Sequence, residues 1–245
     1  MRIYAIGDIH GHLDQLKAAH ARIAVDRAQT GDADASVVHL GDLVDRGPDA
    51  RGVIEYLIEG IARGEPWVVL KGNHDQCFAA QLGIGQSVIS SYRSWTSSDM
   101  GGASTAASYG VEFDRFFGAP SEKRARARLS AAVPEAHKAF LADLPTHHAA
   151  GELIFVHAGI RPGLPMDEQI EEDLLWIRRD FLMDRRDHGA LIVHGHTPVE
   201  APMHCGNRVN LDTGAGYGRP ITVAVFEGRD AWVLREDGRV PLTPG

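Results

Sequence analysis

The sequence predicts an α/β fold in which two mixed β-sheets face each other and helices cover their outer sides. Strand and helix signals alternate through the first third of the 245 residues, as is typical of parallel strands joined by right-handed crossovers. From Leu153 onward, short apolar or alternating runs broken by Gly, Pro and Asp predict a second sheet packed on the first. No repeat or linker separates the two halves, so we expect one domain over residues 1–245.

The elements of the first sheet follow from the spacing of apolar residues. Helices are expected where apolar residues recur every three or four positions, and buried strands where short apolar runs are continuous. The expected elements are strands over Arg2–Ile6, Val37–Leu40 and Trp67–Leu70, helices over His12–Ala28 and Asp49–Arg63, and a further helix after Gln76 to about Leu82.

The middle of the chain carries no strand signal. Residues 83–120 are rich in Gly, Ser and Thr, with Trp95 and Tyr109 embedded, and we expect a long loop region or cap there. Helical signal returns over Ser121–Leu144, first basic and then amphipathic, and a basic helix face is usually solvated surface. Loops this long inside a compact domain are often functional, so residues 83–145 are expected to form a loop and helical cap.

Polar clusters follow the strand ends in both halves of the chain. The expected strands of the second half are Leu153–Val156, Leu191–Val193, Arg208–Leu211, Ile221–Phe226 and Ala231–Arg235. The clusters are GDIHG at 7–11, GDLVDRG at 41–47, GNHD at 72–75, HAGI at 157–160 and GHTP at 195–198. Open α/β sheets bind ligands beyond the carboxyl ends of their strands, so these clusters predict one shared site.

Composition limits the class of protein. An apolar fraction of 44% without a long charge-free apolar run predicts a globular protein with no membrane-spanning segment. Residues 1–8 leave no room for a secretory signal, so we expect a cytoplasmic location. The net charge of −8 argues against a nucleic-acid partner, and the two cysteines, Cys77 and Cys205, are expected as free thiols.

The side chains in these clusters suit divalent metal ions. Asp8 and His10 are two positions apart, so in an extended segment both would point to the same side and hold one ion. Oxygen and imidazole ligands without thiolate fit Mn²⁺, Fe or Zn²⁺. Six candidate ligands are too many for one open catalytic ion and suit two: Asp8, His10, Asp42, Asn73, His157 and His196. Two ions joined by a carboxylate can hold a phosphate and lower the pKa of a shared water.

The five motifs, in this order, resemble those of the calcineurin-like metallophosphoesterases, and among them the phosphoprotein phosphatase (PPP) family. That family's pattern is GDxHG, GDxVDRG, GNHE, HA or HG, and GH or AH, and the match spans most of this chain. The GHTP ending and the LDTGA stretch at Leu211–Ala215 resemble the bacterial branch typified by bacteriophage lambda phosphatase. The resemblance implies a four-layer αββα sandwich, two divalent metal ions with Mn²⁺ expected ahead of Fe or Zn²⁺, and a phosphoprotein or phosphopeptide substrate.

The resemblance also implies which residues hold the metals. Asp8 and His10 would bind the first ion, and Asp42 would bridge both ions. The ligands completing the second ion would be Asn73, His157 and His196. His194, two positions before His196, falls on the same side by strand alternation, and we expect it in core packing or in a hydrogen bond behind the ligands.

Further residues would contact the substrate or move its proton. By the same resemblance, His74 would be the general acid, and the neighbouring carboxylate of Asp45 would keep its imidazole charged and oriented. Arg46 would bind phosphate oxygens in a bidentate manner. Arg178 matches a second phosphate-binding arginine of the family, whereas Arg179 is expected on the surface. Together the expected phosphate contacts are Arg46, Asn73, His74 and Arg178.

The expected reaction is in-line attack on a phosphomonoester by a metal-bridging hydroxide, without a phosphoenzyme. Neither cysteine lies in a Cys-x5-Arg loop, and no Asp-x-Asp-x-Thr is present. The resemblance to the PPP family implies a serine/threonine protein phosphatase, with dual specificity left open.

Two alternatives remain at this point. Asp75 stands where the family pattern has Glu, a variant also seen in bacterial diadenosine tetraphosphatases of the superfamily, so a diadenosine tetraphosphate or other nucleotide phosphohydrolase is one alternative. A non-catalytic scaffold on the same fold is the other. The presence of His74, Asp45 and Arg46 argues against a scaffold, because a protein that only binds partners needs no general acid.

Overall fold

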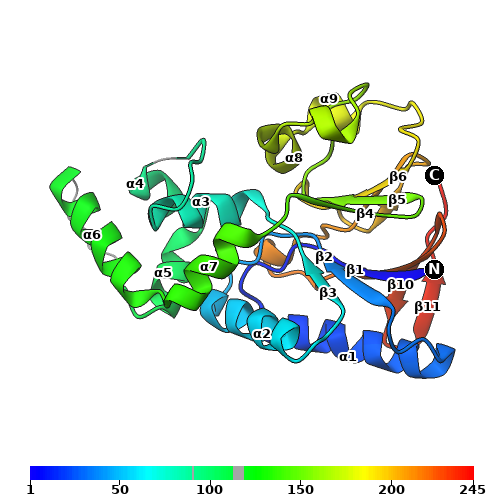
Figure 1. Cartoon of the computed structure of the whole chain (residues 1–245), viewed down its shortest axis with the longest axis horizontal. Helices are drawn as coiled ribbons and strands as arrows, with labels where there is room; N and C mark the ends of the chain where they lie inside the picture. Colours follow the sequence, from blue (N-terminus) through cyan, green and yellow to red (C-terminus); the bar gives the residue numbers. More distant parts are fainter. Residues whose placement is uncertain (90, 113–118) are drawn as a thin grey trace.

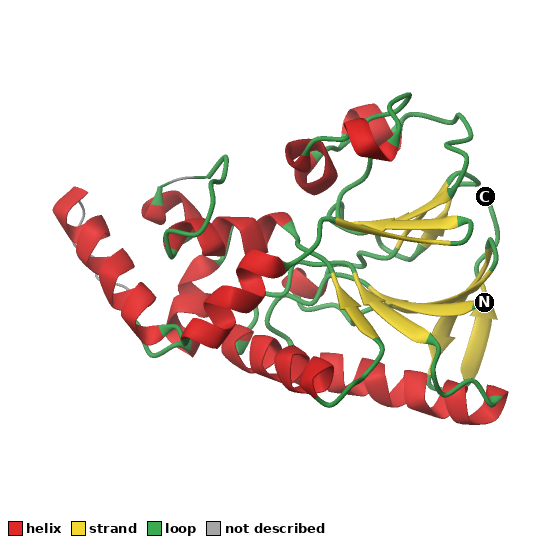
Figure 2. Ribbon diagram, viewed as in Figure 1, coloured by secondary structure: helices red, strands yellow, loops and turns green. Residues whose placement is uncertain are grey.

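The computed structural model describes residues 1–89, 91–112 and 119–245, and its strands form two mixed sheets (Figures 1 and 2). The six-stranded sheet has the order β11-β10-β9-β1-β2-β3, in which β1, β2 and β3 run parallel and the other pairs antiparallel. The five-stranded sheet has the order β4-β5-β6-β8-β7, with parallel pairing of β5, β6 and β8 and antiparallel edge strands. The expected α/β fold with two mixed sheets is confirmed.

The elements have the following bounds. The strands are β1 (Arg2–Ile6), β2 (Ser36–His39), β3 (Trp67–Val69), β4 (His147–Ala150), β5 (Leu153–Val156), β6 (Leu191–His194), β7 (Met203–His204), β8 (Arg208–Asn210), β9 (Val223–Glu227), β10 (Asp230–Arg235) and β11 (Gly238–Pro241). The α-helices are α1 (Leu13–Thr30), α2 (Ala50–Ala62), α3 (Asn73–Gln81), α4 (Tyr92–Trp95), α5 (Gly102–Ser108), α6 (Ala119–Ala132), α7 (Glu135–Asp143), α8 (Glu171–Trp176) and α9 (Arg179–Leu182).

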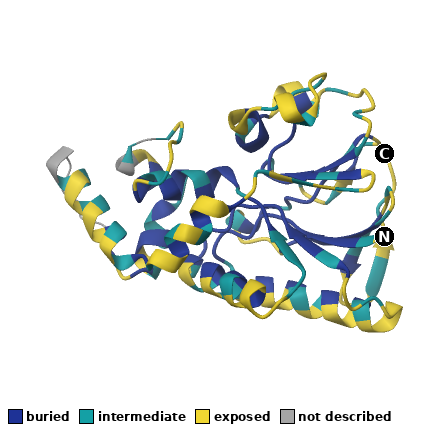
Figure 3. Ribbon diagram, in the orientation of Figure 1, coloured by how far each residue is buried: buried dark blue, intermediate teal, exposed yellow. Residues whose placement is uncertain are grey.

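Strand β1 shows how the layers are divided. Ile3 and Ala5 belong to the apolar cluster shared by the two sheets, whereas Tyr4 and Ile6 belong to the cluster that includes the inner faces of α1 and α2. On the outer side of the second sheet, Ile192 packs with residues of α8 and α9. The layers are therefore α1 with α2, the first sheet, the second sheet, and α8 with α9, and the central strands of both sheets are buried (Figure 3).

The middle of the chain is more helical than expected. Residues 83–120 were expected as a long loop region, but α4 and α5 lie within the described part of that range; residues 90 and 113–118 fall outside it. The helical run expected over Ser121–Leu144 is two helices, α6 and α7, which are separated at Pro134 because proline lacks the N–H that a continuous helix needs. Helices α3 to α7 lie together beside the sheets (Figure 1).

Several short elements carry too little pattern to be expected. Strands β4, β7 and β11 are edge strands in which every residue except His204 is half-exposed or exposed, and α8 and α9 have six and four residues. Helix α3 begins at Asn73, inside the GNHD motif and not after Gln76. None of the helices that the structure describes is long and apolar enough to span a membrane.

Candidate active site

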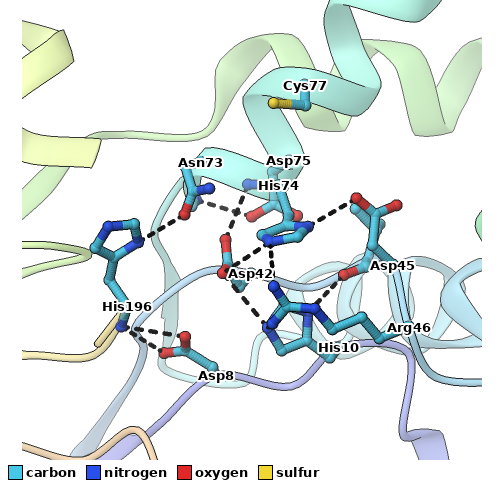
Figure 4. A network of polar contacts seen from close by, with 12 residues as sticks. Asp8, His10, Asp42, Asp45, Arg46, Asn73, His74, Asp75, Cys77 and His196 are labelled. Carbon is cyan, nitrogen blue, oxygen red and sulfur yellow. Dashed lines mark hydrogen bonds and ion pairs between the residues drawn. The ribbon is translucent and has the colours of Figure 1, made fainter. Parts of the chain in front are cut away.

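Five strand ends deliver the polar motifs to one place. β1, β2, β3, β5 and β6 are each followed by one of them, and the first three strands run parallel, so their carboxyl ends lie at the same edge. Figure 4 shows side chains from four of these loops converging. The expectation that the motifs after these strand ends lie together is confirmed.

Asp42 lies at the centre of the site. Two groups of potential metal ligands share its carboxylate: one with His10 and His74, the other with His157 and His196, and within each group the ligand atoms lie within 4.8 Å of one another. Its Oδ2 is 3.5 Å from His10 Nε2, and its Oδ1 is 3.3 Å from His157 Nε2. One buried carboxylate thus faces two ligand clusters, as a bridging ligand would.

Backbone carbonyls orient two of the histidines. His10 Nδ1 lies 3.0 Å from the Val44 oxygen, and His157 Nδ1 lies 2.8 Å from the Leu40 oxygen, so each Nδ1–H donates to a carbonyl. The Nε2 of each ring therefore carries no proton, and its lone pair faces the site. Metal-ligating histidines are usually held in this way.

The second cluster gathers around one amide oxygen. Asn73 Oδ1 lies 2.9 Å from His157 Nε2 and 2.8 Å from His196 Nδ1. Because His157 Nε2 carries no proton in this tautomer, that nitrogen and the amide oxygen present lone pairs to each other. This close approach of two acceptors suits a cation.

Asp8 reaches the site by another route than the sequence suggested. His10 has φ 47°, so residues 8–10 are not the extended segment on which the expectation for these two side chains rested. The Asp8 carboxylate accepts from the His196 backbone N–H, with Oδ2 at 3.1 Å, and belongs to neither ligand group. It faces Asp212, and burial together with that charge raises the pKa of Asp8 well above its ordinary value.

His74 and Asp45 form a buried pair. His74 Nδ1 lies 2.8 Å from Asp45 Oδ2, which also accepts from Trp95 Nε1 at 3.1 Å. Asp45 Oδ1 accepts from the Thr105 hydroxyl at 2.7 Å, and the Asp45 N–H donates to the same hydroxyl oxygen at 2.8 Å. Helices α4 and α5 therefore hold the carboxylate that orients His74.

The two arginines differ in placement. The Arg46 guanidinium lies inside the site, with Nη1 2.9 Å from His10 Nε2 and Nη2 3.1 Å from His74 Nε2. Arg178 is exposed, and its Nη1 donates to Thr197 Oγ1 at 3.4 Å. Its charge lowers the pKa values of His157 and His196 in addition to burial, which places it at the rim beside the second cluster. Arg179 is exposed, as expected.

The site is built on strained backbone. Among the described residues, every non-glycine residue with left-handed φ lies in it, and they are His10, Asp42, Asp45, Arg46 and His196, with φ from 47° to 70°. Such conformations are sparsely populated and cluster at functional sites. The loops also touch closely: a Cβ on Gly72 would lie 2.1 Å from the Asp42 nitrogen, so only glycine fits.

Electrostatics of the site fit divalent cations. The carboxylates of five aspartates are almost fully buried here, namely Asp8, Asp42, Asp45, Asp75 and Asp212. Burial lowers the pKa of His10 to about 3 and of His196 to about 2, so these ligands are neutral imidazoles. Buried carboxylates without balancing charge are costly, and Arg46 supplies one positive charge. Two divalent ions would supply the remaining positive charge that these carboxylates need, and the ligand set of carboxylate, amide and imidazole fits such ions.

Two other predicted residues turn out to be structural. His194 is buried and packs edge-on against Phe181, so core packing is the correct reading; His196 lies beyond the strand, where alternation stops. The Asp75 carboxylate accepts from the Gly72 and Leu43 N–H groups at 2.8 and 2.9 Å and ties the GNHD loop to the Asp42 loop. Asp75 is 1% exposed, and its contacts are those of a residue that joins two loops.

Sequence reasoning missed four residues at the site. Trp95 and Thr105 hold Asp45 but come from a region without a motif, and no local signal marks them. Asp212 and Tyr217 follow β8, where the strand-end rule could have found them, in and beyond the LDTGA stretch. The Tyr217 ring centroid lies 4.8 Å from the Arg46 guanidinium carbon.

Comparison with known proteins gives the following similarities. Residues 1–226 match the family model of calcineurin-like phosphoesterases. A bis(5′-nucleosyl)-tetraphosphatase (asymmetrical) of Geobacillus thermodenitrificans is 29% identical over 241 residues, covering 91% of this chain and 89% of that protein. Among solved structures, a provisionally assigned diadenosine tetraphosphatase superposes with a TM-score of 0.64 at 21% identity, covering 100% and 95% of the two chains. A cold-active protein-tyrosine phosphatase of a Shewanella species has a TM-score of 0.57 at 15% identity, covering 99% and 80%.

Proposed function

Given that the chain belongs to the calcineurin-like phosphoesterase family, whose members hydrolyse phosphoester bonds with divalent metal ions, we propose that its substrate is a dinucleoside tetraphosphate such as diadenosine tetraphosphate. The observation that carries the proposal is the similarity to bis(5′-nucleosyl)-tetraphosphatases along nearly the full length of both chains. These relatives favour the nucleotide alternative over the protein phosphatase expected first.

The residues present fit two metal ions. His10 and Asp42, with Asp8, would hold one, and Asp42 would share its carboxylate with the other. The remaining ligands of the second ion would be Asn73, His157 and His196. Bound there, two divalent ions would neutralise phosphate oxygens and supply an activated water.

The chain's own side chains would position the phosphates and the proton. Arg46 and Arg178 carry fixed positive charge at different parts of the site: Arg46 lies beside His10, and Arg178 donates to Thr197, the neighbour of His196 in sequence. A chain of several phosphates would lie across both. His74 would give a proton to the departing oxygen while Asp45, held at 2.8 Å, keeps the imidazole oriented and stabilises its charge.

A serine/threonine protein phosphatase is the second candidate. The observation in its favour is the buried pair of His74 and Asp45, because a serine or threonine alkoxide is a poor leaving group that needs a proton, whereas a nucleotide phosphate leaves readily near neutral pH. Dependence on His74 therefore discriminates between the two.

The test compares substrates on one preparation. Metal-stripped protein refilled with Mn²⁺ is assayed with diadenosine tetraphosphate and with phosphoserine, phosphothreonine and phosphotyrosine peptides at equal concentration. We expect a kcat/KM at least tenfold higher for the dinucleotide, with ATP and AMP as products by chromatography. A tenfold preference for any phosphopeptide would refute the proposal in favour of a protein phosphatase.

A further inference from the structure

We propose that a pocket beside Arg46 binds one nucleoside of the substrate and that Tyr217 stacks on its base; the choice of ligand rests on the function proposed above. The pocket has a volume of about 580 Å³ and lies between residues 96–104 and the turn at Gly216–Tyr217. Such a volume is within the range of small-molecule sites. A phosphoserine side chain would leave most of it unfilled.

Arg46 connects this pocket to the metal-ligand cluster. Its guanidinium is within hydrogen-bond distance of His10 and His74, and the residue also lines the pocket. A phosphate bound by Arg46 would therefore place the group attached to it at the pocket mouth. No other cation is present among the residues that line the pocket, so it suits an uncharged nucleoside better than further phosphates. The rest of the phosphate chain would run toward Arg178, which donates to Thr197 next to His196.

Tyr217 presents an aromatic ring to this pocket. It is 64% exposed, the one exposed aromatic side chain among the large apolar residues of the described chain, and it ends the short turn Ala215–Tyr217. Gly214 and Gly218, with φ 87° and 82°, flank that turn in left-handed conformations, which glycine adopts without strain. Arg46 lies 4.8 Å from the ring centroid, so the ring is held by a cation–π contact and most of its surface stays open.

Polar groups at the pocket wall are oriented to accept hydrogen bonds. The hydroxyls of Ser97 and Ser104 each donate to a carbonyl three residues earlier, at 2.8 Å, which leaves oxygen lone pairs for a ligand. Ribose hydroxyls and base amino groups are donors that match them. An aromatic ring for the base and acceptors for donor groups together suit a nucleoside. Stacking is tolerant of the base, so we expect little discrimination among bases.

The test isolates the base. Isothermal titration calorimetry on the Mn²⁺-loaded protein compares the non-hydrolysable methylenephosphonate analogues of AMP and of ribose 5-phosphate, which differ only by the base. We expect the AMP analogue to bind about tenfold more tightly, within the range of one stacked base. Tyr217→Phe should keep this preference and Tyr217→Ala should reduce it to less than twofold. Val25→Ala, an exposed apolar change on α1, is the matched control and should keep it.

The outcomes separate this inference from the proposed function. A wild-type protein that hydrolyses diadenosine tetraphosphate but binds the two analogues within twofold would overturn the nucleoside pocket and leave the proposed function standing. A Tyr217→Ala variant that keeps the preference would overturn the role of Tyr217. Loss of the preference in Val25→Ala would also overturn it, since a remote change would then have the same effect.

Discussion

Replacing Thr105 with Val tests whether helix α5 holds the general-acid pair in place. The change keeps the shape of the buried side chain but removes a hydroxyl that donates to Asp45 Oδ1 at 2.7 Å and accepts from the Asp45 N–H at 2.8 Å. A lost hydrogen bond to a carboxylate costs about 1.5–3 kcal/mol, and a buried N–H left unpaired costs about 1–3 kcal/mol. Since the two effects share one site, we expect a loss of about 3 kcal/mol in the free energy of unfolding.

For a chain of this length that loss corresponds to a fall in Tm of about 6–12 °C, measured by circular dichroism on metal-loaded protein. Thr105→Ser is the control, because it keeps the hydroxyl and loses one methyl group, at about 1 kcal/mol. We also expect kcat to fall about tenfold in Thr105→Val, in the range found for residues that orient a catalytic group. The reasoning is refuted if the two variants melt within 2 °C of each other.

Three further changes test other parts of the site and the fold. His74→Asn should lower kcat by at least about 100-fold for phosphoserine peptides, and less for diadenosine tetraphosphate, with Mn²⁺ content by elemental analysis unchanged; a collapse of metal content would show that His74 is a ligand. Asp42→Asn should lower the Mn²⁺ bound per chain, since both clusters share this carboxylate; wild-type stoichiometry would contradict a bridging role. Burial lowers the pKa of His39 from 6.5 to about 4, so its protonation favours the unfolded chain, and stability present above pH 6.5 is lost as the pH falls toward 4. Between pH 7 and pH 5, the free energy of unfolding measured with urea should therefore fall by about 2 kcal/mol less for His39→Gln than for the wild type. Equal falls would refute this.

The layered fold could be predicted because its strands are short and continuously apolar. In β1, side chains from Ile3 to Ile6 alternate between two buried faces, so that run is continuously apolar, and the motif glycine that follows marks its end. Edge strand β4, with two histidines and two alanines, has no such pattern. Helices α4 and α5 are too short for an apolar period to show, which is why residues 83–120 were expected as loops.

The metal-ligand clusters could be predicted because each candidate ligand lies in a motif at a strand end. The path of Asp8 could not, since the left-handed backbone at His10 is set by contacts with another loop. The roles of Trp95 and Thr105 could not be predicted for a similar reason. Their partner, Asp45, is 50 and 60 residues away in sequence, and only the packing of α4 and α5 brings them together.

Substrate class was the least accessible property. Asp75 pointed toward nucleotide hydrolases by resemblance, yet its buried carboxylate accepts hydrogen bonds from two backbone N–H groups and joins two loops. The residues that we propose to contact the nucleoside lie in the pocket beside Arg46, where Tyr217 follows a motif and residues 96–104 do not. The proposed pocket is therefore a surface assembled from segments distant in the sequence, which no local pattern reveals.

The left-handed residues of the site have an evolutionary consequence. Each costs about 1–3 kcal/mol of strain, and glycine would relieve it at any of them while removing a functional side chain. At His196, whose buried Nε2 has no hydrogen-bond partner among the described residues, replacement by glycine can thus remove a candidate metal ligand and leave the fold no less stable. Inactive descendants that keep this architecture for binding alone are therefore open to drift, whereas regaining the enzyme from such a descendant requires the strain to be restored.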